Sequence, residues 1–218
     1  DVLVAIDGSQ IDARMIAALS QDPEYMKLFE PGRDLHSEVA LRVFNRPECR
    51  EEMARNNGRC ECEYRTRAKK GGHGWNYGMQ VGAMVAQLGI TREVAQEFHD
   101  GMASAFPVLV RWQNETRASA GALPYGVEAP ADDKYRIIHT AFGRPVRVER
   151  DRAFTQACAL LGQGSTRDAM AEAAIRLSPD HRRRIRAVIH DEFVFSIPRD
   201  GAEETAKVIA DSMSFTLR

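Results

Sequence analysis

Two short hydrophobic regions at opposite ends of the chain constrain its fold more than any other feature. Residues 2–6, and residues 185–189 with 193–197, are apolar runs rich in β-branched side chains, which is typical of buried strands. The first run ends on Asp7, and Asp191 lies between the last two. Burying such strands beside carboxylates is costly unless the charge is compensated, which a divalent cation does well. We therefore predict that the two regions lie side by side and share bound cations.

Asp7 and Asp191 are the candidate metal ligands. Two carboxylates on adjacent strands can hold two Mg²⁺ ions about 3.5–4 Å apart, the arrangement used for in-line phosphoryl transfer. The alternative is that Asp7-Gly8-Ser9 and His190-Asp191-Glu192 are ordinary polar turns, because Asp and Gly are common in turns. Either motif alone does not decide between these interpretations.

The region between the strands is predicted to be mostly helical. Apolar residues recur at helical spacing from Ile11, and Asp22-Pro23 is typical of a helix start. Further helices are expected over residues 35–44, 92–106 and 107–120. Residues 122–134 are rich in Pro, Gly, Ala and Asp, which indicates a loop.

The last third of the chain alternates strands and helices. Two strands are expected over residues 135–142 and 145–148. A helix over residues 152–177 is predicted to be interrupted at Gly162-Gln163-Gly164, and Asp200 with Glu203 has the form of a capping box for a final helix. This order predicts an α+β fold in which an antiparallel sheet carries a long, mostly helical insertion.

One basic stripe suits a nucleoside triphosphate. Four residues spaced by four share one face if their segment is helical: Arg65, Lys69, His73 and Tyr77. Cations would bind the phosphates, and rings would contact the base and sugar. Gly71, Gly72 and Gly74 count against a helix because each costs about 1 kcal/mol relative to Ala. A flexible basic loop is the alternative.

The cysteines give a weaker indication of a metal site. Cys49, Cys60 and Cys62 with His73 could form a zinc set, but their spacing lacks the C-x2-C knuckle of structural zinc sites. The four cysteines, which include Cys158, also follow no disulfide framework. Reduced thiols in a cytoplasmic protein are the favoured interpretation.

Bulk properties limit the possible classes of protein. The net charge is −1, which argues against a dedicated nucleic-acid binder. The sequence contains neither an apolar run long enough for a bilayer nor a signal peptide at its start. Because the chain begins at Asp1 and enters a strand at once, we expect a fragment or trimmed protein.

The motifs together resemble those of the family-A DNA polymerases, and the resemblance covers essentially the whole chain. The segment Asp7-Gly8-Ser9-Gln10-Ile11-Asp12-Ala13-Arg14 resembles the family's first catalytic motif, D-Y-S-Q-I-E-L-R. The basic stripe is similar to the fingers-helix motif R-x3-K-x3-F-x3-Y-G. Further similarities are Gly32-Arg33-Asp34-Leu35-His36 to G-x-D-I-H, Thr140-Ala141-Phe142-Gly143-Arg144 to T-x-F-G-R, Gln163-Gly164-Ser165 to Q-G-[ST], and His190-Asp191-Glu192 to H-D-E.

The resemblance implies template-directed addition of deoxynucleotides to a primer 3′ end, in replication or repair. Primer–template DNA and dNTPs would be the partners of a monomeric enzyme. Asp7, Asp191 and the Gly8 carbonyl would bind two Mg²⁺ ions, and Lys69 would also protonate the departing pyrophosphate. The residues implied at the incoming nucleotide are Arg65, Lys69, His73, Tyr77, Gln10, Asp12 and His36. Those implied at the primer–template are Arg144, Gln163, His190 and Glu192. Glu192 would also support the strand ends that bind the metal ions.

The same resemblance divides the chain into domains. Residues 1–13 and 135–218 would form the palm, and residues 14–134 the fingers. We expect no counterpart of the thumb, of an upstream exonuclease domain, or of the final palm strand, so that the isolated chain would hold DNA poorly.

Four positions depart from the family pattern. Gly8 replaces Tyr, His73 replaces Phe or Tyr, and Ala159 stands where Asn is usual. Asp12 replaces the Glu that excludes a ribose 2′-hydroxyl and bonds the hydroxyl of the conserved tyrosine. Because Asp is one methylene shorter, we expect weaker exclusion of ribonucleotides.

Two other functions agree with parts of the sequence. His190-Asp191 could belong to a metal-dependent HD-type phosphohydrolase, but in that class the pair lies on a helix, whereas here it separates β-branched runs. A DNA-binding module without chemistry would leave Asp7 and Asp191 dispensable.

Overall fold

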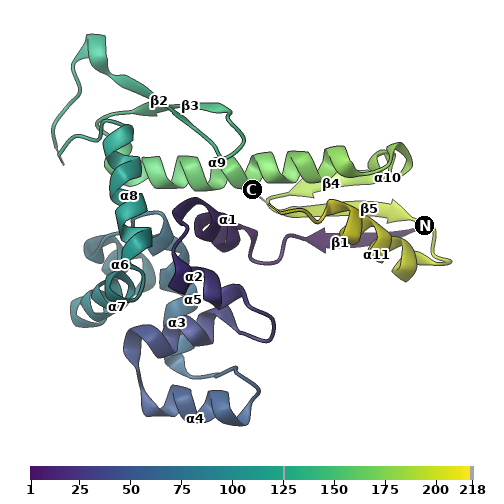
Figure 1. Ribbon diagram of the computed structural model, residues 1–218, viewed down its shortest axis with the longest axis horizontal. Helices are drawn as coiled ribbons and strands as arrows, with labels where there is room; N and C mark the ends of the chain where they lie inside the picture. Colours follow the sequence, from purple (N-terminus) through teal and green to yellow (C-terminus); the bar gives the residue numbers. More distant parts are fainter. Residues whose placement is uncertain (125, 217–218) are drawn as a thin grey trace.

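One long helix, α9 (Ala153–Arg176), runs from the helical region to the sheet in the computed structural model (Figure 1). The structure describes residues 1–124 and 126–216. Residue 125, inside the predicted loop 122–134, and residues 217–218 lie outside the described residues. The strands are β1 Val2–Asp7, β2 Tyr135–His139, β3 Pro145–Glu149, β4 Ile185–Ile189 and β5 Glu192–Ile197. Within the described ranges, no helix is long and apolar enough to cross a membrane.

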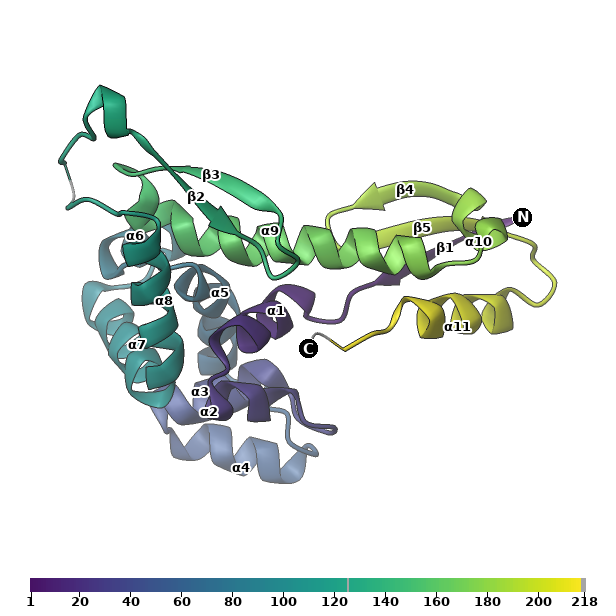
Figure 2. The ribbon, with the colours of Figure 1, turned by 45° about the horizontal axis from the view of Figure 1, so that its top comes forward.

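The two ends of the chain meet in an antiparallel sheet of order β1-β5-β4. β1 pairs with β5 in a register that runs from Val2 opposite Ile197 to Asp7 opposite Glu192. Phe193, Phe195 and Ile197 of β5 are buried, and α9 and α11 cover this face (Figure 2). The predicted adjacency of the first strand and the late hairpin is therefore confirmed.

The region between β1 and β2 is helical, as expected. Its α-helices are α1 Ile11–Ser20, α2 Pro23–Met26, α3 Leu35–Phe44, α4 Pro47–Arg55, α5 Glu63–Asn76, α6 Val81–Leu88, α7 Arg92–Ala105 and α8 Pro107–Ser119; η1 Lys27–Phe29 and η2 Ala131–Asp133 are 3₁₀ turns. α3 packs against α5 and α7 around one core that includes Phe44, Trp75, Phe98 and Leu109. α4 and α6 were not predicted; in α4 only Cys49 and Met53 are buried, so the apolar period is weak.

The predicted interruption of the long helix is wrong. α9 runs unbroken from Ala153 to Arg176. Gly162 serves close packing instead, because a Cβ there would lie 2.7 Å from Tyr77 Cε1 and 2.9 Å from Ile16 Cδ1. The glycine thus lets α9 approach the helical region, and its cost to helix propensity is offset by this contact.

β2 and β3 form a hairpin separate from the β1-β5-β4 sheet. The β2 strand ends at His139, earlier than predicted, because residues 140–144 form the turn, with Gly143 at φ +79°. Ile138 and Val148 pack on Ala153 and Ala157 at the start of α9. The hairpin is therefore held by the opposite end of α9 from the sheet (Figure 2).

The chain ends with two helices, α10 Pro179–Arg183 and α11 Ala202–Met213. The short α10 was not predicted. The predicted capping box at Asp200 and Glu203 is wrong: Gly201 is the N-cap of α11 at φ +73°, with no side-chain capping bond among the described residues. A left-handed glycine turns the chain here, so Asp200 lies one residue too early to cap.

We expect Gly162→Ala to lower the free energy of unfolding by about 1–3 kcal/mol, because the added methyl forces apart α9, Tyr77 and Ile16. Urea denaturation measures this. Gly82→Ala in α6 is the control, since open space surrounds its Cβ position and Ala favours the helix. Equal stability of the two variants would contradict the packing role of Gly162.

Candidate active site

Asp7 and Asp191 lie together at one end of the sheet. β1 ends at Asp7, and His190-Asp191 forms the turn between β4 and β5, with His190 in the left-handed region at φ +56°. The Gly8 N–H donates a 3.0 Å hydrogen bond to the Asp191 carbonyl. This bond ties the end of the first strand directly to the late hairpin.

The electrostatics of this pair favour a cation. Partial burial raises the pKa of Asp7, and so do the charge and hydrogen bonding of Asp191, while the Gly8 N–H lowers it. Two carboxylates that repel each other at a sheet end suit a divalent cation, which compensates both charges. The Gly8 carbonyl already accepts a hydrogen bond from Ile11 N–H at 3.0 Å, which leaves its second lone pair for a metal.

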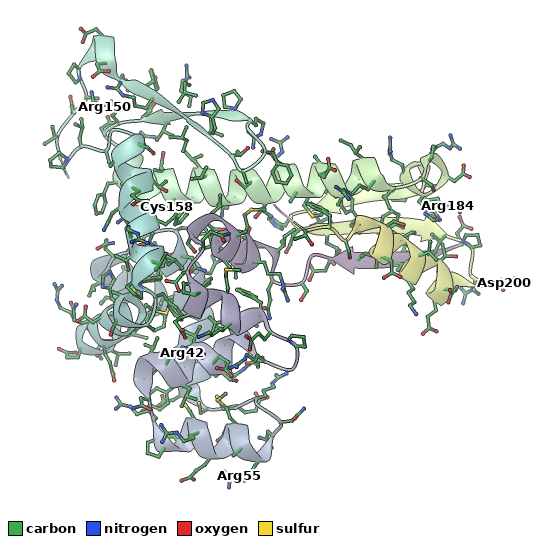
Figure 3. The ribbon with its side chains drawn as sticks, in the orientation of Figure 1. Arg42, Arg55, Arg150, Cys158, Arg184 and Asp200 are labelled. Carbon is green, nitrogen blue, oxygen red and sulfur yellow. The ribbon has the colours of Figure 1, made fainter. Side chains whose placement is uncertain are left out.

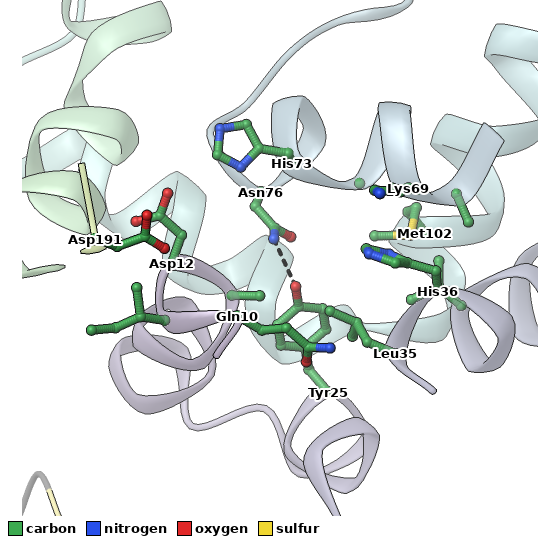
Figure 4. Close-up of a pocket in the computed structure, with 15 residues that line it drawn as sticks. Gln10, Asp12, Tyr25, Leu35, His36, Lys69, His73, Asn76, Met102 and Asp191 are labelled. Carbon is green, nitrogen blue, oxygen red and sulfur yellow. Dashed lines mark hydrogen bonds between the residues drawn. The ribbon is translucent and has the colours of Figure 1, made fainter. Parts of the chain in front are cut away.

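A cavity of about 240 Å³ opens beside Asp191, between α1, α3 and α5 (Figure 4). Asp12 and Asp191 lie on one side of it, and Lys69 and His36 on the other. The residues chosen from the sequence that line it are Gln10, Asp12, His36, Lys69, His73 and Asp191. Most of the predicted nucleotide contacts therefore surround one space.

The basic stripe is helical, as one of the two interpretations predicted. α5 contains Arg65, Lys69 and His73, and Tyr77 is its C-cap. The helix tolerates its glycines because two of them allow close contacts: a Cβ on Gly71 would lie 2.8 Å from Phe98, and one on Gly74 would lie 2.4 Å from Met79.

Arg65 is held away from the cavity lining. Its Nε and Nη2 donate to Asp34 at 2.8 and 3.0 Å, and Asp34 also caps α3 by accepting from Ser37 N–H. Burial raises the pKa of Asp34, but the Arg65 and Ser37 hydrogen bonds outweigh it and hold that pKa well below its usual range. The pair thus fixes α5 against α3, a role that the sequence did not indicate for Asp34.

His36 is a neutral group beside two cations. Burial lowers its pKa, and the charges of Arg65 and Lys69 lower it further against the opposing effect of Asp34. A neutral imidazole can donate or accept a hydrogen bond at the cavity wall.

Asp12 and Tyr77 are neighbours without a good hydrogen bond. Asp12 accepts from Thr166 Oγ1 at 2.8 Å, whereas the buried Tyr77 hydroxyl has no partner among the residues described. Burial, followed by the nearby Asp12 charge, raises the pKa of Tyr77. The shorter side chain at position 12 therefore bonds α9 instead of the tyrosine.

The four residues implied at the primer–template lie in two places. Arg144 donates to Asp168 at 2.6 Å and to the Gly164 carbonyl at 3.0 Å, which joins the β2–β3 turn to α9, where Gln163 is exposed. His190 and Glu192 flank Asp191 at the sheet end. Asp168 was missed by the sequence analysis, although it lies one helical turn after Gly164.

Other cavity residues were also missed. Asn76 Nδ2 donates to the buried Tyr25 hydroxyl at 2.6 Å, and both line the cavity (Figure 4). Gln113 Nε2 donates to the carbonyls of Trp75 and Asn76, which supports the end of α5. Asn76 follows His73 by three residues, so the helical spacing of the stripe could have identified it.

The profile of DNA polymerase family A matches residues 1–218. The chain belongs to this family. It is 30% identical over 224 residues to "DNA polymerase I, thermostable" of Thermus aquaticus, covering 97% of this chain, and 29% identical to the DNA polymerase of Mycobacterium phage D29. The chain spans 24% and 32% of the lengths of these two polymerases.

A solved structure of this family agrees with the fold. The chain is similar to the POL domain of Pol1 from M. smegmatis in complex with DNA primer-template and dNTP, with a TM-score of 0.78 and 26% identity. The similarity covers 99% of this chain and 37% of that one. The expected family and α+β fold are both confirmed.

We expect Asp7→Asn to raise the free energy of unfolding at pH 7 without divalent cations, because burial and Asp191 disfavour the charged form of Asp7. The increase should be at most about 1 kcal/mol, since water screens this partly hydrated pair. A raised folded-state pKa means that ionisation of Asp7 destabilises the fold as pH rises through that pKa. The gain should therefore disappear below about pH 4, the ordinary Asp pKa. Urea titrations at several pH values measure it.

Asp200→Asn, at the far end of the sheet domain (Figure 3), is the matched control and should show no such dependence on pH. A gain for Asp7→Asn that persists unchanged at low pH would mean that charge repulsion is not its cause.

Proposed function

We propose that this chain carries the nucleotidyl-transfer site of a template-directed DNA polymerase that adds dNTPs to a primer 3′ end. The observation that carries the proposal is the placement of Asp7 next to Asp191, which lines one cavity together with Lys69 and His73. Family membership over the whole chain supports it, as does the likeness to a polymerase domain whose title names primer-template and dNTP.

We propose Asp7, Asp191 and the Gly8 carbonyl as ligands of two Mg²⁺ ions. The raised pKa of Asp7, caused by burial and by Asp191, supports a site that requires a cation. Such ions, when bound, activate the primer hydroxyl and stabilise the leaving pyrophosphate. Glu192, opposite Asp7 in the sheet, supports the position of both strand ends.

The protein groups have separate roles in this proposal. Lys69 binds the triphosphate and donates a proton to pyrophosphate, and His73, Gln10 and His36 contact the incoming nucleotide. Arg65 contributes to phosphate binding in one of two ways. Its charge attracts the triphosphate from where it stands, or its guanidinium leaves the Asp34 carboxylate and donates to a phosphate instead, since both groups accept such hydrogen bonds. Tyr77 packs beside the nascent base pair.

The remaining assignments concern DNA and domains. Arg144, Gln163 and His190 contact the primer–template, with Arg144 held in place by Asp168. Residues 1–13 and 135–218 form the palm, and residues 14–134 form the fingers. The separate core clusters of the helical region and of the β1-β5-β4 sheet support this division.

The HD-phosphohydrolase alternative loses support from the location of its motif. His190-Asp191 lies in a turn between antiparallel strands, whereas that class requires the pair on a helix. A DNA-binding module without chemistry is tested by the next experiment, since it would retain its function when Asp191 is neutralised.

Asp191→Asn in the protein that carries this chain should reduce Mg²⁺-dependent primer extension by about 10³-fold or more, because several kcal/mol of transition-state stabilisation are lost. A gel assay of a labelled primer measures it, with binding of primer–template measured in parallel. Asp200→Asn is the charge-matched control and should extend normally. Full activity of Asp191→Asn would exclude the mechanism.

The contact of Asp12 with Thr166 predicts weak discrimination between ribonucleotides and deoxyribonucleotides. Wild-type protein should incorporate ribonucleotides from mixed pools, and Asp12→Glu should lower that incorporation roughly tenfold because its longer side chain reaches the Tyr77 hydroxyl. Incorporation of dNTPs by the same variant is the internal control. Complete exclusion of ribonucleotides by wild-type protein would contradict this account.

A further inference from the structure

Three cysteines form a compact cluster on the far side of α3 from the nucleotide cavity. Cys49 belongs to α4, and Cys60 and Cys62 to the connection that follows it. The Cys62 sulfur lies 2.9 Å from that of Cys49 and 3.3 Å from that of Cys60, and all three sulfurs lie within 4.8 Å of one another. Cys49 and Cys60 are fully buried, and Cys62 is partly exposed.

The helix that carries Cys49 contributes few apolar side chains to the core. α4 projects from the helical region (Figure 1), and among its nine residues only Cys49 and Met53 are buried. Asn57 and Gly58, both at positive φ, reverse the chain so that Cys60 and Cys62 return to Cys49. A small polar extension of this kind gains little from hydrophobic burial and is commonly stabilised by a crosslink or a metal.

We propose that Cys49, Cys60 and Cys62 bind one Zn²⁺-like thiophilic dication. Tetrahedral coordination at Zn–S distances of about 2.3 Å places sulfur atoms roughly 3.8 Å apart. The Cys62 sulfur, at 2.9 and 3.3 Å from the other two, therefore needs to move away from each by less than about 1 Å. On binding, the thiols lose their protons to solvent and coordinate as thiolates. Because Cys62 is partly exposed, we expect water to supply the fourth ligand.

The spatial arrangement outweighs the sequence spacing that counted against zinc. A C-x2-C knuckle brings two ligands together locally, whereas here a helix and a reversed chain do so. His73, the fourth residue considered from the sequence, is not part of the group because it lines the nucleotide cavity instead.

Hydrogen bonds connect this cluster to the basic helix. Cys60 N–H donates to Ser37 Oγ at 3.0 Å, and that hydroxyl donates to Asp34 at 2.7 Å, the partner of Arg65. Cys62 is the N-cap residue of α5. A bound cation would therefore fix the start of the helix that carries Arg65 and Lys69, which is a positioning role.

Direct metal binding by the reduced, chelator-treated protein tests the proposal. Titration with Co²⁺ should produce intense near-ultraviolet thiolate-to-cobalt absorption and the visible bands of a tetrahedral ion, saturating at one equivalent and lost on addition of Zn²⁺. With excess Mg²⁺ present to occupy the Asp7 and Asp191 site, one equivalent of Zn²⁺ should raise the melting temperature by about 5–10 °C. These measurements on wild-type protein require neither a variant nor polymerase activity.

Variants identify the ligands. Cys49→Ser, Cys60→Ser and Cys62→Ser should each weaken Zn²⁺ binding at least tenfold. Cys158→Ser should bind one equivalent normally, because Cys158 is a buried thiol in α9, remote from α4 (Figure 3). If a ligand variant fails to fold, the wild-type cobalt spectrum still decides.

Two outcomes would overturn the proposal. One is reduced wild-type protein that shows no thiolate-to-cobalt absorption, or that binds Co²⁺ no more tightly than a variant with Cys49, Cys60 and Cys62 all changed to Ser. The other is a protein whose mass falls by two hydrogens in air, because oxygen oxidises Cys49 and Cys62 to a disulfide, and which binds no Zn²⁺ after that disulfide is reduced.

Discussion

The pairing of β1 with β5 is the interaction on which the rest of the structure depends. It joins the first and last thirds of the chain, and the Gly8 N–H to Asp191 carbonyl bond extends it to the two carboxylates. Without this register, Asp7 and Asp191 would belong to unrelated surfaces. Because the strands are antiparallel, β1 ends where β5 begins. The burial and the repulsion by Asp191 that raise the pKa of Asp7 therefore follow from the sheet, and a bound cation would compensate for them.

α9 transmits that arrangement to the helical region. Its second half packs on β5, its first half holds the β2–β3 hairpin, and its middle contacts Tyr77 and Ile16 through Gly162. Thr166 and Asp168, which lie on different faces of the same helix, bond Asp12 and Arg144 respectively. One helix therefore sets the distance between the metal-binding end of the sheet, the nucleotide cavity and the proposed DNA surface.

The basic helix α5 is positioned by tertiary contacts, apolar as well as polar, rather than by its own propensity. Its glycines weaken it as an isolated helix, yet Gly71 and Gly74 permit contacts with Phe98 and Met79. The Arg65–Asp34 pair fixes it against α3, and Gln113 supports its last turn. The cysteine cluster at its N-terminus belongs to the same set of restraints, which hold Lys69 and His73 toward Asp191 while leaving their side chains exposed to the cavity.

The sequence by itself determined the family, the α+β class, the terminal strands, and the charged residues that line the cavity, because these depend on local periodicity and on motifs that are contiguous or regularly spaced. It did not determine the continuity of α9, the cap at Gly201, or the partners Asp34, Thr166 and Asp168. Those were decided by tertiary structure, since the cost of a glycine or the partner of a carboxylate depends on which distant side chain lies beside it. The three cysteines make the same point: their spacing argued against a metal site, and only the reversed chain after α4 brought their sulfurs together.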